Sequence, residues 1–274
     1  MADTLSSYDS DRRPPPVVEE FLQAMRYRDL IRQLVRRDVL IRYKRSLLGV
    51  VWTMLNPLGM MIVLTLAFST LFGTTRAYPV YVLSGLIVWT FLAQSTTTAM
   101  AQLTWGGALF HRIYLPRTTF AIASVGTGLV NLVLSLVPFG LVMAFTGSPL
   151  RPTALILPVS ILLLALFTLG LGLFLSSLAV YFPDIAEMYQ IVLLAWMYLT
   201  PIIYPEEIVP PAYRWWMFNL NPMYHLLQLF RLPLYDGRWP GLAHLALAAA
   251  IALVTFAIGW TMFTRRADEF AYRV

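Results

Sequence analysis

The sequence contains no cysteine, so disulfide bonds and cysteine-ligated zinc or redox centres are excluded. Charge is also scarce, because charged residues make up 12% of the 274 residues, about half their usual share in soluble domains. Hydrophobic residues make up 58%, and the mean hydropathy is +0.67. This composition excludes a soluble enzyme and favours a membrane protein. At about 20 residues per crossing, the chain has room for about six spans and for no large catalytic domain outside the membrane.

Lysine occurs once, at Lys44 in the segment Arg42-Tyr43-Lys44-Arg45. An ATP-binding P-loop needs Gly-x-x-x-x-Gly-Lys-Ser/Thr, because its lysine contacts the terminal phosphates. The chain therefore cannot hydrolyse ATP through a P-loop, and any ATPase must be another polypeptide. An HExxH motif is also missing, and the three histidines are scattered, so we predict no zinc site, no catalytic residue and no cofactor in this chain. Ser176-Ser177 lies in an apolar run without a Gly-x-Ser-x-Gly elbow, which favours helix packing over a nucleophile.

Six long stretches lack charge, apart from one ionisable residue near the start of two of them. Each reaches about 20 residues, which is enough to cross about 30 Å of hydrocarbon as a helix. The runs are continuous rather than alternating, so helices are favoured over a barrel. The sequence thus predicts an all-α integral membrane protein with six transmembrane helices, at residues 50–72, 80–103, 120–145, 153–182, 185–204 and 242–264.

No ionisable residue lies near the middle of any predicted span. Proton-driven transport through an intramembrane carboxylate is therefore not expected. Burying a charged group in the membrane costs free energy, so such groups occur there only where they serve a function. Fifteen basic residues fall on the predicted inner side and five on the outer side. This bias predicts that both termini are cytoplasmic, and it explains the net charge of +6 by topology rather than by nucleic-acid binding.

The basic segment before the first span predicts an amphipathic helix at the membrane interface, at residues 21–46. At about 100° per residue, one face is apolar and the other polar. The apolar face carries Leu30, Ile31, Leu34, Val35 and Ile41, interrupted by Asp38 and Arg45, whereas the polar face carries Arg28, Asp29, Arg32, Gln33 and Arg37. The helix either touches a cytosolic partner or serves as a basic membrane anchor. Residues 1–20 are expected to form a disordered cytosolic tail, 47–264 the membrane domain, and 265–274 a second tail.

Two cytoplasmic connections offer candidate partner contacts. The loop 105–119 has Gly106-Gly107 before a short amphipathic run and Pro116 after it, which predicts either a brief helix that a soluble motor could grip or simple loop structure. Asp184 and Glu187 follow the fourth span. Their position favours the start of a helix, and a contact with a partner protein is the second interpretation.

The connection 201–240 contains seven prolines yet is rich in tryptophan, tyrosine and leucine. A solvated loop would be more polar, and the apolar pieces are too short to cross a membrane. We therefore predict external re-entrant half-helices between spans five and six. An interfacial aromatic belt is the alternative for aromatic residues such as Trp215.

A set of short motifs in a fixed order resembles the type-2 ABC exporter permeases for lipid-linked polysaccharides. No single motif is specific for this family, but the order of the motifs together with the six predicted spans is specific. The motifs are Arg37-Asp38, Arg42-Tyr43-Lys44, Leu48-Gly49, Trp52, Asn56-Pro57, Leu115-Pro116-Arg117, Asp184-Ile185, Thr200-Pro201-Ile202-Ile203-Tyr204, Asn221-Pro222 and Arg231. One departure is Phe182-Pro183 before Asp184, where many members have an arginine.

The resemblance implies a homodimer of this permease with two ATP-binding cassette subunits that hold ATP and Mg²⁺, in a bacterial inner membrane. The substrate would be an undecaprenyl-linked O-antigen, capsule or teichoic acid. The resemblance assigns three groups of residues: Phe110, His111, Arg112, Ile113, Leu115, Pro116 and Arg117 to coupling with the ATPase; Arg32, Arg36, Arg42, Tyr43 and Lys44 to the interfacial helix; and Trp196, Tyr198, Tyr204 and Trp215 to the substrate path. Two alternatives stay open: a type-2 exporter of drugs or simple lipids, and a non-catalytic membrane scaffold or channel.

Overall fold

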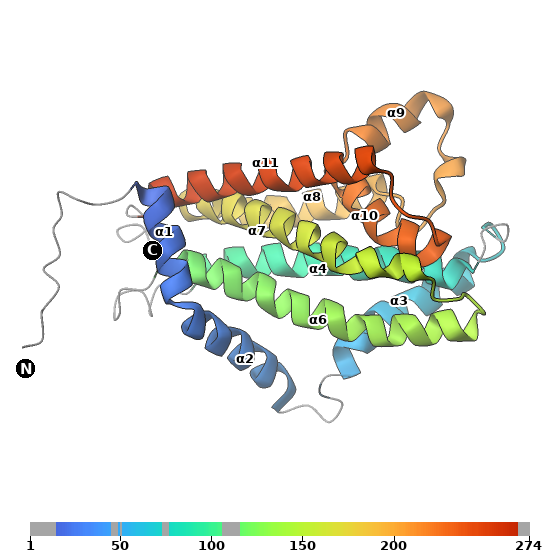
Figure 1. The fold of residues 1–274 in the computed structure, drawn as a ribbon, viewed down its shortest axis with the longest axis horizontal. Helices are drawn as coiled ribbons and strands as arrows, with labels where there is room; N and C mark the ends of the chain where they lie inside the picture. Colours follow the sequence, from blue (N-terminus) through green and yellow to red (C-terminus); the bar gives the residue numbers. More distant parts are fainter. Residues whose placement is uncertain (1–14, 45–48, 50, 73–76, 106–115, 268–274) are drawn as a thin grey trace, which may run out of the picture.

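The computed structural model describes residues 15–44, 49, 51–72, 77–105 and 116–267, and within these residues every regular element is helical. The longest helices run roughly along one axis and form a single bundle (Figure 1). In chain order the elements are α1 (Pro16–Arg26), α2 (Arg28–Lys44), α3 (Val51–Phe68), α4 (Tyr78–Trp105), α6 (Thr118–Phe145), η2 (Pro152–Ile156), α7 (Leu157–Tyr181), α8 (Ile185–Leu199), η3 (Glu206–Ile208), α9 (Pro211–Asn219), α10 (Pro222–Arg231), η4 (Leu232–Asp236) and α11 (Leu242–Arg266).

Five of the six predicted spans are long and apolar enough to cross a membrane, namely α3, α4, α6, α7 and α11. The fifth predicted span, 185–204, is shorter than predicted, because α8 ends at Leu199 after 15 residues. Thr200 precedes Pro201 and is extended (φ −96°, ψ 132°), since proline disfavours helical geometry in the residue before it. A helix of that length rises about 22 Å, which is less than the hydrocarbon thickness of about 30 Å. The predicted helix start before α8 is confirmed, with Asp184 as N-cap residue and Glu187 in the first turn.

The helix α4 lies at the centre of the bundle. In the most apolar 18-residue stretch of α4, 78% of the residues are buried, whereas the corresponding share is 17% in α3 and also in α11. It packs on α3, α6 and α7, and its Thr96 hydroxyl lies 2.9 Å from the Tyr189 hydroxyl of α8. A second tight contact joins α7 and α11, where Gly170 faces Gly259 and the two backbones meet closely. Small residues allow such approaches between apolar helices.

The two described ends of the chain lie at the same end of the bundle, here called the terminal end (Figure 1). At this end Trp260 of α11 donates a hydrogen bond from Nε1 to the carbonyl oxygen of Val17 in α1, at 3.1 Å. Arg117, just before α6, donates to the carbonyl oxygen of Ala267 at 3.5 Å. The opposite end carries η3, α9, α10 and η4 (Figure 1).

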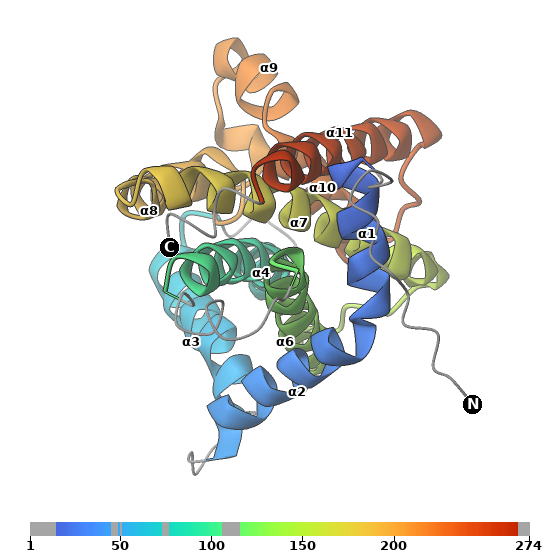
Figure 2. The same cartoon turned by 90° about the vertical axis from the view of Figure 1, so that its left-hand side faces the viewer.

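The predicted interfacial helix 21–46 is two helices rather than one. The first begins at Pro16, a residue type suited to the first helical turn, so residues 16–20 belong to α1 and not to a tail. The break falls at Tyr27 (φ −91°, ψ 19°), and α2 then turns away along α6 (Figure 2). Further on, α3 continues through Pro57 as a helix, so Asn56-Pro57 does not end it.

Candidate functional site

The apolar face predicted for the segment before the first span packs against the first half of α6. Leu34 is buried with Phe120 and Ala123, and Leu30, Ile31 and Val35 cover this contact. Arg32 is exposed, as predicted for the polar face of this helix, and Arg36 is exposed as well. Ile41 departs from the prediction, because 66% of its surface is exposed. Arg42, Tyr43 and Lys44 form the last turn of α2, but their side chains lie outside the described residues.

Asp38 interrupts the apolar face of α2 for a structural reason. Its carboxylate forms a 2.8 Å ion pair with Arg37 and accepts a hydrogen bond from Gln102 Nε2 of α4 at 3.2 Å. Gln102 in turn accepts a hydrogen bond from Ser124 of α6 at 3.0 Å. A polar network therefore joins α2, α4 and α6 next to the apolar contact.

Of the residues predicted to couple to an ATPase, only Pro116 and Arg117 belong to the described part of the chain, and they lie at the terminal end. Phe110, His111, Arg112, Ile113 and Leu115 lie outside the described residues. The two described members, Pro116 and Arg117, precede α6 directly: Pro116 is buried and Arg117 is half-buried. Thr118 donates a hydrogen bond to Glu20 of α1 at 2.7 Å, so this segment is held against α1.

Arg231 is the centre of the opposite end, and only 2% of its surface is exposed. Its guanidinium donates to the carbonyl oxygens of Pro201 (2.8 Å) and Tyr81 (3.3 Å) and to the Ser84 hydroxyl (3.3 Å). The guanidinium carbon also lies 3.7 Å from the centre of the Tyr81 ring, which is a cation–π contact. One side chain of α10 thus ties together the start of α4 and the turn after α8.

A cavity of about 720 Å³ opens beside Arg231 at this end of the bundle. Glu206 accepts hydrogen bonds from Tyr224, at 2.9 Å, and from Gln228, so η3 is attached to α10. Burial raises the pKa of Glu206 above its ordinary value, although the Tyr224 hydrogen bond and the charge of Arg231 lower it. Burial likewise raises the pKa of Asp236. The cavity combines carboxyl groups, phenols and the edge of one guanidinium.

Trp196 acts with Asn221 to position α10. The Asn221 side chain caps α10 by accepting from the backbone N–H groups of Met223 and Tyr224, as expected for asparagine at an N-cap. The same side-chain oxygen accepts from Trp196 Nε1 at 2.8 Å. The Trp196 ring also meets the Trp89 ring edge-on at 5.9 Å between centroids. These contacts give Trp196 a structural role in addition to its predicted place on the substrate path.

The other predicted path residues lie at or near the same end of the bundle but differ in exposure. The Tyr204 hydroxyl donates to the carbonyl oxygen of Tyr198 at 2.8 Å, and Tyr198 is 57% exposed. Trp215 lies on the projecting helix α9 and is 67% exposed (Figure 1). The structure thus brings Tyr198 and Tyr204 together and places Trp215 on a separate element.

A family model for the ABC-2 type transporter matches residues 29–235. The chain belongs to the ABC-2 type transporter family. This transporter chain is 32% identical over 249 residues to the O-antigen export system permease protein RfbA of Myxococcus xanthus, a match that covers 89% of this chain and 95% of that protein. It is 22% identical over 247 residues to RfbA of Klebsiella pneumoniae, covering 89% and 94%. It is 24% identical over 247 residues to the polysialic acid transport protein KpsM of Escherichia coli, covering 87% and 93%. The resemblance inferred from the ordered motifs is confirmed.

Sequence reasoning missed two features of this ABC-2 chain. Arg231 was predicted as one of the external charges and as part of a family motif, not as a buried residue, although a lone arginine in the otherwise apolar run Leu229–Leu234 was a usable signal. The polar residues of α4 and α6, such as Gln102 and Ser124, were also missed, because uncharged side chains do not interrupt an apolar run. Their spacing of about one helical turn could have revealed them.

The carboxyl group of Glu206 gives the transporter a pH-dependent stability. Because burial raises its pKa above the ordinary value of 4.5, the folded state holds the proton more tightly than the unfolded state. The free energy of unfolding therefore falls as the pH rises from 4.5, the ordinary pKa, through the raised pKa of Glu206 in the folded state. In detergent, we expect the thermal midpoint of the wild type to fall more steeply between these pH values than that of Glu206→Gln. Equal slopes for the two proteins would contradict this assignment.

Proposed function

We propose that this chain is the permease subunit of an ATP-driven exporter that moves undecaprenyl-linked polysaccharide across the bacterial inner membrane. The observation that carries the proposal is the match, over almost the whole length of both chains, to permeases named for O-antigen export and polysialic acid transport. The apolar helices supply the membrane domain. The missing P-loop lysine assigns ATP hydrolysis to a separate subunit.

The working unit in this proposal contains two copies of the permease and two ATP-binding subunits, which bind ATP and Mg²⁺. Both termini lie in the cytoplasm, so the terminal end of the bundle faces the ATPase. Beside the five long apolar helices, α8 serves as the sixth crossing, and α9 and α10 form the external re-entrant pair. Closure of the ATP-binding subunits moves the loop before α6, and the spans change their packing to open a path for lipid and glycan.

The loop before α6 carries two arginines that we expect to contact the ATPase, Arg112 and Arg117. Reversing both charges, as Arg112→Glu with Arg117→Glu, removes attraction and adds repulsion at this contact. Stimulation of the partner's ATPase by the permease is expected to fall about tenfold or more. The measurement is ATP turnover of the co-purified complex in proteoliposomes. Unchanged stimulation with intact complex would dismiss this loop as the contact.

The simplest tests of the proposal use the purified chain and the living cell. The chain alone should show no ATP hydrolysis, and robust ATP hydrolysis without a partner would contradict the proposal. Depletion of the chain in its host should trap lipid-linked glycan on the cytoplasmic side, detected by extraction and by its protection from external glycosidases. If glycan export continues while export of drugs or simple lipids stops, the alternative type-2 exporter function holds instead.

A further inference from the structure

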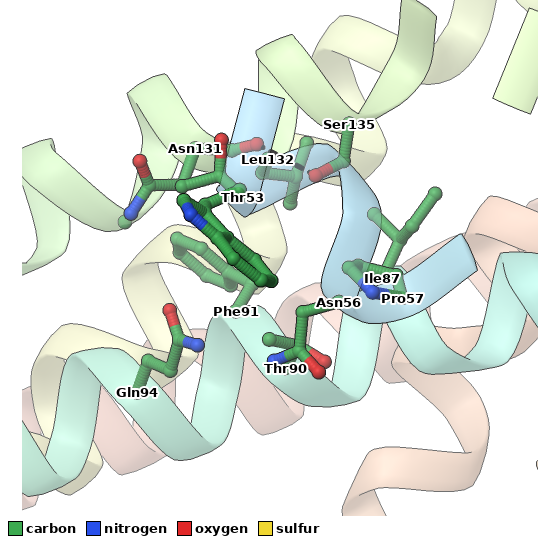
Figure 3. Close-up of a pocket in the computed structure, with 12 residues that line it drawn as sticks. Thr53, Asn56, Pro57, Ile87, Thr90, Phe91, Gln94, Asn131, Leu132 and Ser135 are labelled. Atoms are coloured by element: carbon green, nitrogen blue, oxygen red, sulfur yellow. Dashed lines mark hydrogen bonds between the residues drawn. The ribbon is translucent and has the colours of Figure 1, made fainter. Parts of the chain in front are cut away.

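We propose that a polar cavity between α2, α3, α4 and α6 binds the sugar headgroup of the lipid-linked substrate, an inference that rests on the proposed function. The cavity consists of two adjoining chambers of about 190 Å³ and about 350 Å³. Both chambers are lined by Gln94, Gly128 and Asn131. Figure 3 shows the first chamber, where side chains of α3, α4 and α6 converge. The larger chamber falls within the volume range of about 300–1,000 Å³ that is usual for ligand pockets.

Polar side chains line the cavity from three membrane helices. On α4 and α6 they recur about every helical turn, so they share one face of each helix. Polar groups are costly in apolar helices unless they meet a partner or line a cavity. The polar lining residues are Thr53 and Asn56 of α3, Thr90, Gln94, Ser95, Thr98 and Gln102 of α4, and Ser124, Thr127, Asn131 and Ser135 of α6.

Two hydroxyls in the larger chamber are buried and have no hydrogen-bond partner within the described part of the chain. Ser95 is 1% exposed and Thr127 is 7% exposed, and neither side-chain oxygen is paired. The Ser95 hydroxyl fills the space that the missing side chain of Gly128 leaves, because a Cβ atom at this position would overlap the Ser95 hydroxyl oxygen. A buried unpaired polar group costs about 1–3 kcal/mol. Such a cost is offset when a ligand with hydroxyl groups pairs with both.

The lining chemistry indicates a neutral, hydroxyl-rich ligand. Among the described lining residues of both chambers, Asp38 is the one charged side chain, and no lysine or arginine is present. Cations are the strongest partners of phosphate, and none lies among the described lining residues, so a neutral ligand is favoured over a phosphate group. Sugar hydroxyls both donate and accept, which matches the amides, hydroxyls and carboxylate of the cavity. Trp52 and Phe91 add apolar ring faces on which a sugar ring can pack.

The rim of the cavity favours a sugar carried on a lipid over a free sugar. Ile41 of α2 is 66% exposed and Trp52 of α3 is 58% exposed, and both line the cavity. These two helices lie on the outside of the bundle (Figure 2). An apolar rim on the outermost helices suits a polyprenyl chain that stays in the lipid phase while its sugar enters the cavity.

The test measures binding to the permease alone, without ATP or partner, in nanodiscs of phosphatidylethanolamine and phosphatidylglycerol. The probes are undecaprenyl diphosphate N-acetylglucosamine, undecaprenyl diphosphate without a sugar, and soluble N-acetylglucosamine. We expect the sugar-bearing lipid to bind the wild type more tightly than either of the other two probes. In Ser95→Ala with Thr127→Val, its affinity should fall about tenfold or more, because two hydrogen bonds of about 1 kcal/mol each are lost.

A matched control separates binding from packing. The side-chain oxygens of Ser176 and Thr65 are also buried and have no partner among the described residues, but these two residues line neither chamber. Ser176→Ala with Thr65→Val should therefore bind the sugar-bearing lipid as tightly as the wild type. Because all four replaced hydroxyls lack partners, neither double variant should lower the thermal midpoint.

Three outcomes would overturn the proposal. The first is equal affinity for the lipid with and without the sugar, and the second is equal affinity for soluble N-acetylglucosamine and for the sugar-bearing lipid. The third is unchanged binding of the sugar-bearing lipid to Ser95→Ala with Thr127→Val. A permease that exports lipid-linked glycan with its partner but shows any of these outcomes refutes the cavity assignment and leaves the proposed function standing. Failure of the wild type to export that glycan refutes the function itself, whatever the binding assay gives.

Discussion

Replacing Gly259 by alanine is expected to lower the free energy of unfolding by about 3 kcal/mol, the upper part of the range for overpacking a well-packed core. A Cβ atom on Gly259 of α11 would overlap the carbonyl oxygen of Gly170 in α7, and a Cβ atom on Gly170 would in turn overlap the backbone of Phe256. The neighbour at this contact is backbone, which cannot move aside as a flexible side chain can. The helices α7 and α11 must therefore separate along their shared contact.

The measurement is the thermal midpoint and the monodispersity of the detergent-solubilised variant. Gly140→Ala is the matched control, because Gly140 also lies in an apolar helix, α6, but a Cβ atom added to it would meet no atom within 4 Å. Alanine is the better helix former, so this control should keep or raise stability. A Gly259→Ala protein as stable as Gly140→Ala would show that the close contact of α7 and α11 is wrong.

The second large effect is expected at Arg231. Arg231→Met should lower the free energy of unfolding by about 3 kcal/mol, because it removes three hydrogen bonds from a charged donor and one buried cation–π contact. Arg231→Lys keeps the charge but not the planar fork, so it should recover only part of the loss. Thermal unfolding of the two variants and the wild type in the same detergent provides the comparison.

Arg214→Met serves as the control for Arg231. Arg214 lies on the projecting helix α9 and donates to the carbonyl oxygens of Val209 and Glu207 at 2.7 and 2.6 Å. It is only partly buried, so its loss should cost less than about 1 kcal/mol. If Arg214→Met and Arg231→Met lower the midpoint by the same amount, Arg231 is not the centre that holds this end of the bundle together.

Much of the fold was predictable because lipid imposes simple rules on a chain. Long uncharged runs predicted the ends of α4, α6 and α11 to within two residues. The helix α3 ends four residues earlier than predicted, and α7 begins four residues later, after η2. The phase of the basic segment predicted the face of α2 that packs on Phe120 and Ala123. Hydropathy failed at α8, because the run 185–204 stays apolar after Pro201 has already ended the helix.

The candidate sites were harder to predict, since they depend on which helix faces meet. Nothing in the local sequence shows that Arg231 reaches Tyr81, because the two residues are 150 positions apart. Ser95 and Thr127 look like ordinary small polar residues until α4 and α6 are placed side by side. Trp196 was assigned to the path by the family resemblance, and its hydrogen bond to Asn221 became visible only in the folded chain.

The most direct test of the central claim is transport by the reconstituted pair. The permease and its ATP-binding subunit are placed in proteoliposomes with undecaprenyl-linked glycan in the membrane, and glycan that becomes accessible to glycosidase on the far side is measured. We expect transport that requires ATP, requires both subunits, and stops when the P-loop lysine of the ATP-binding subunit is replaced. Glycan transport by the permease alone, or ATP-driven export of drugs or simple lipids with no movement of the glycan, would contradict the proposed function.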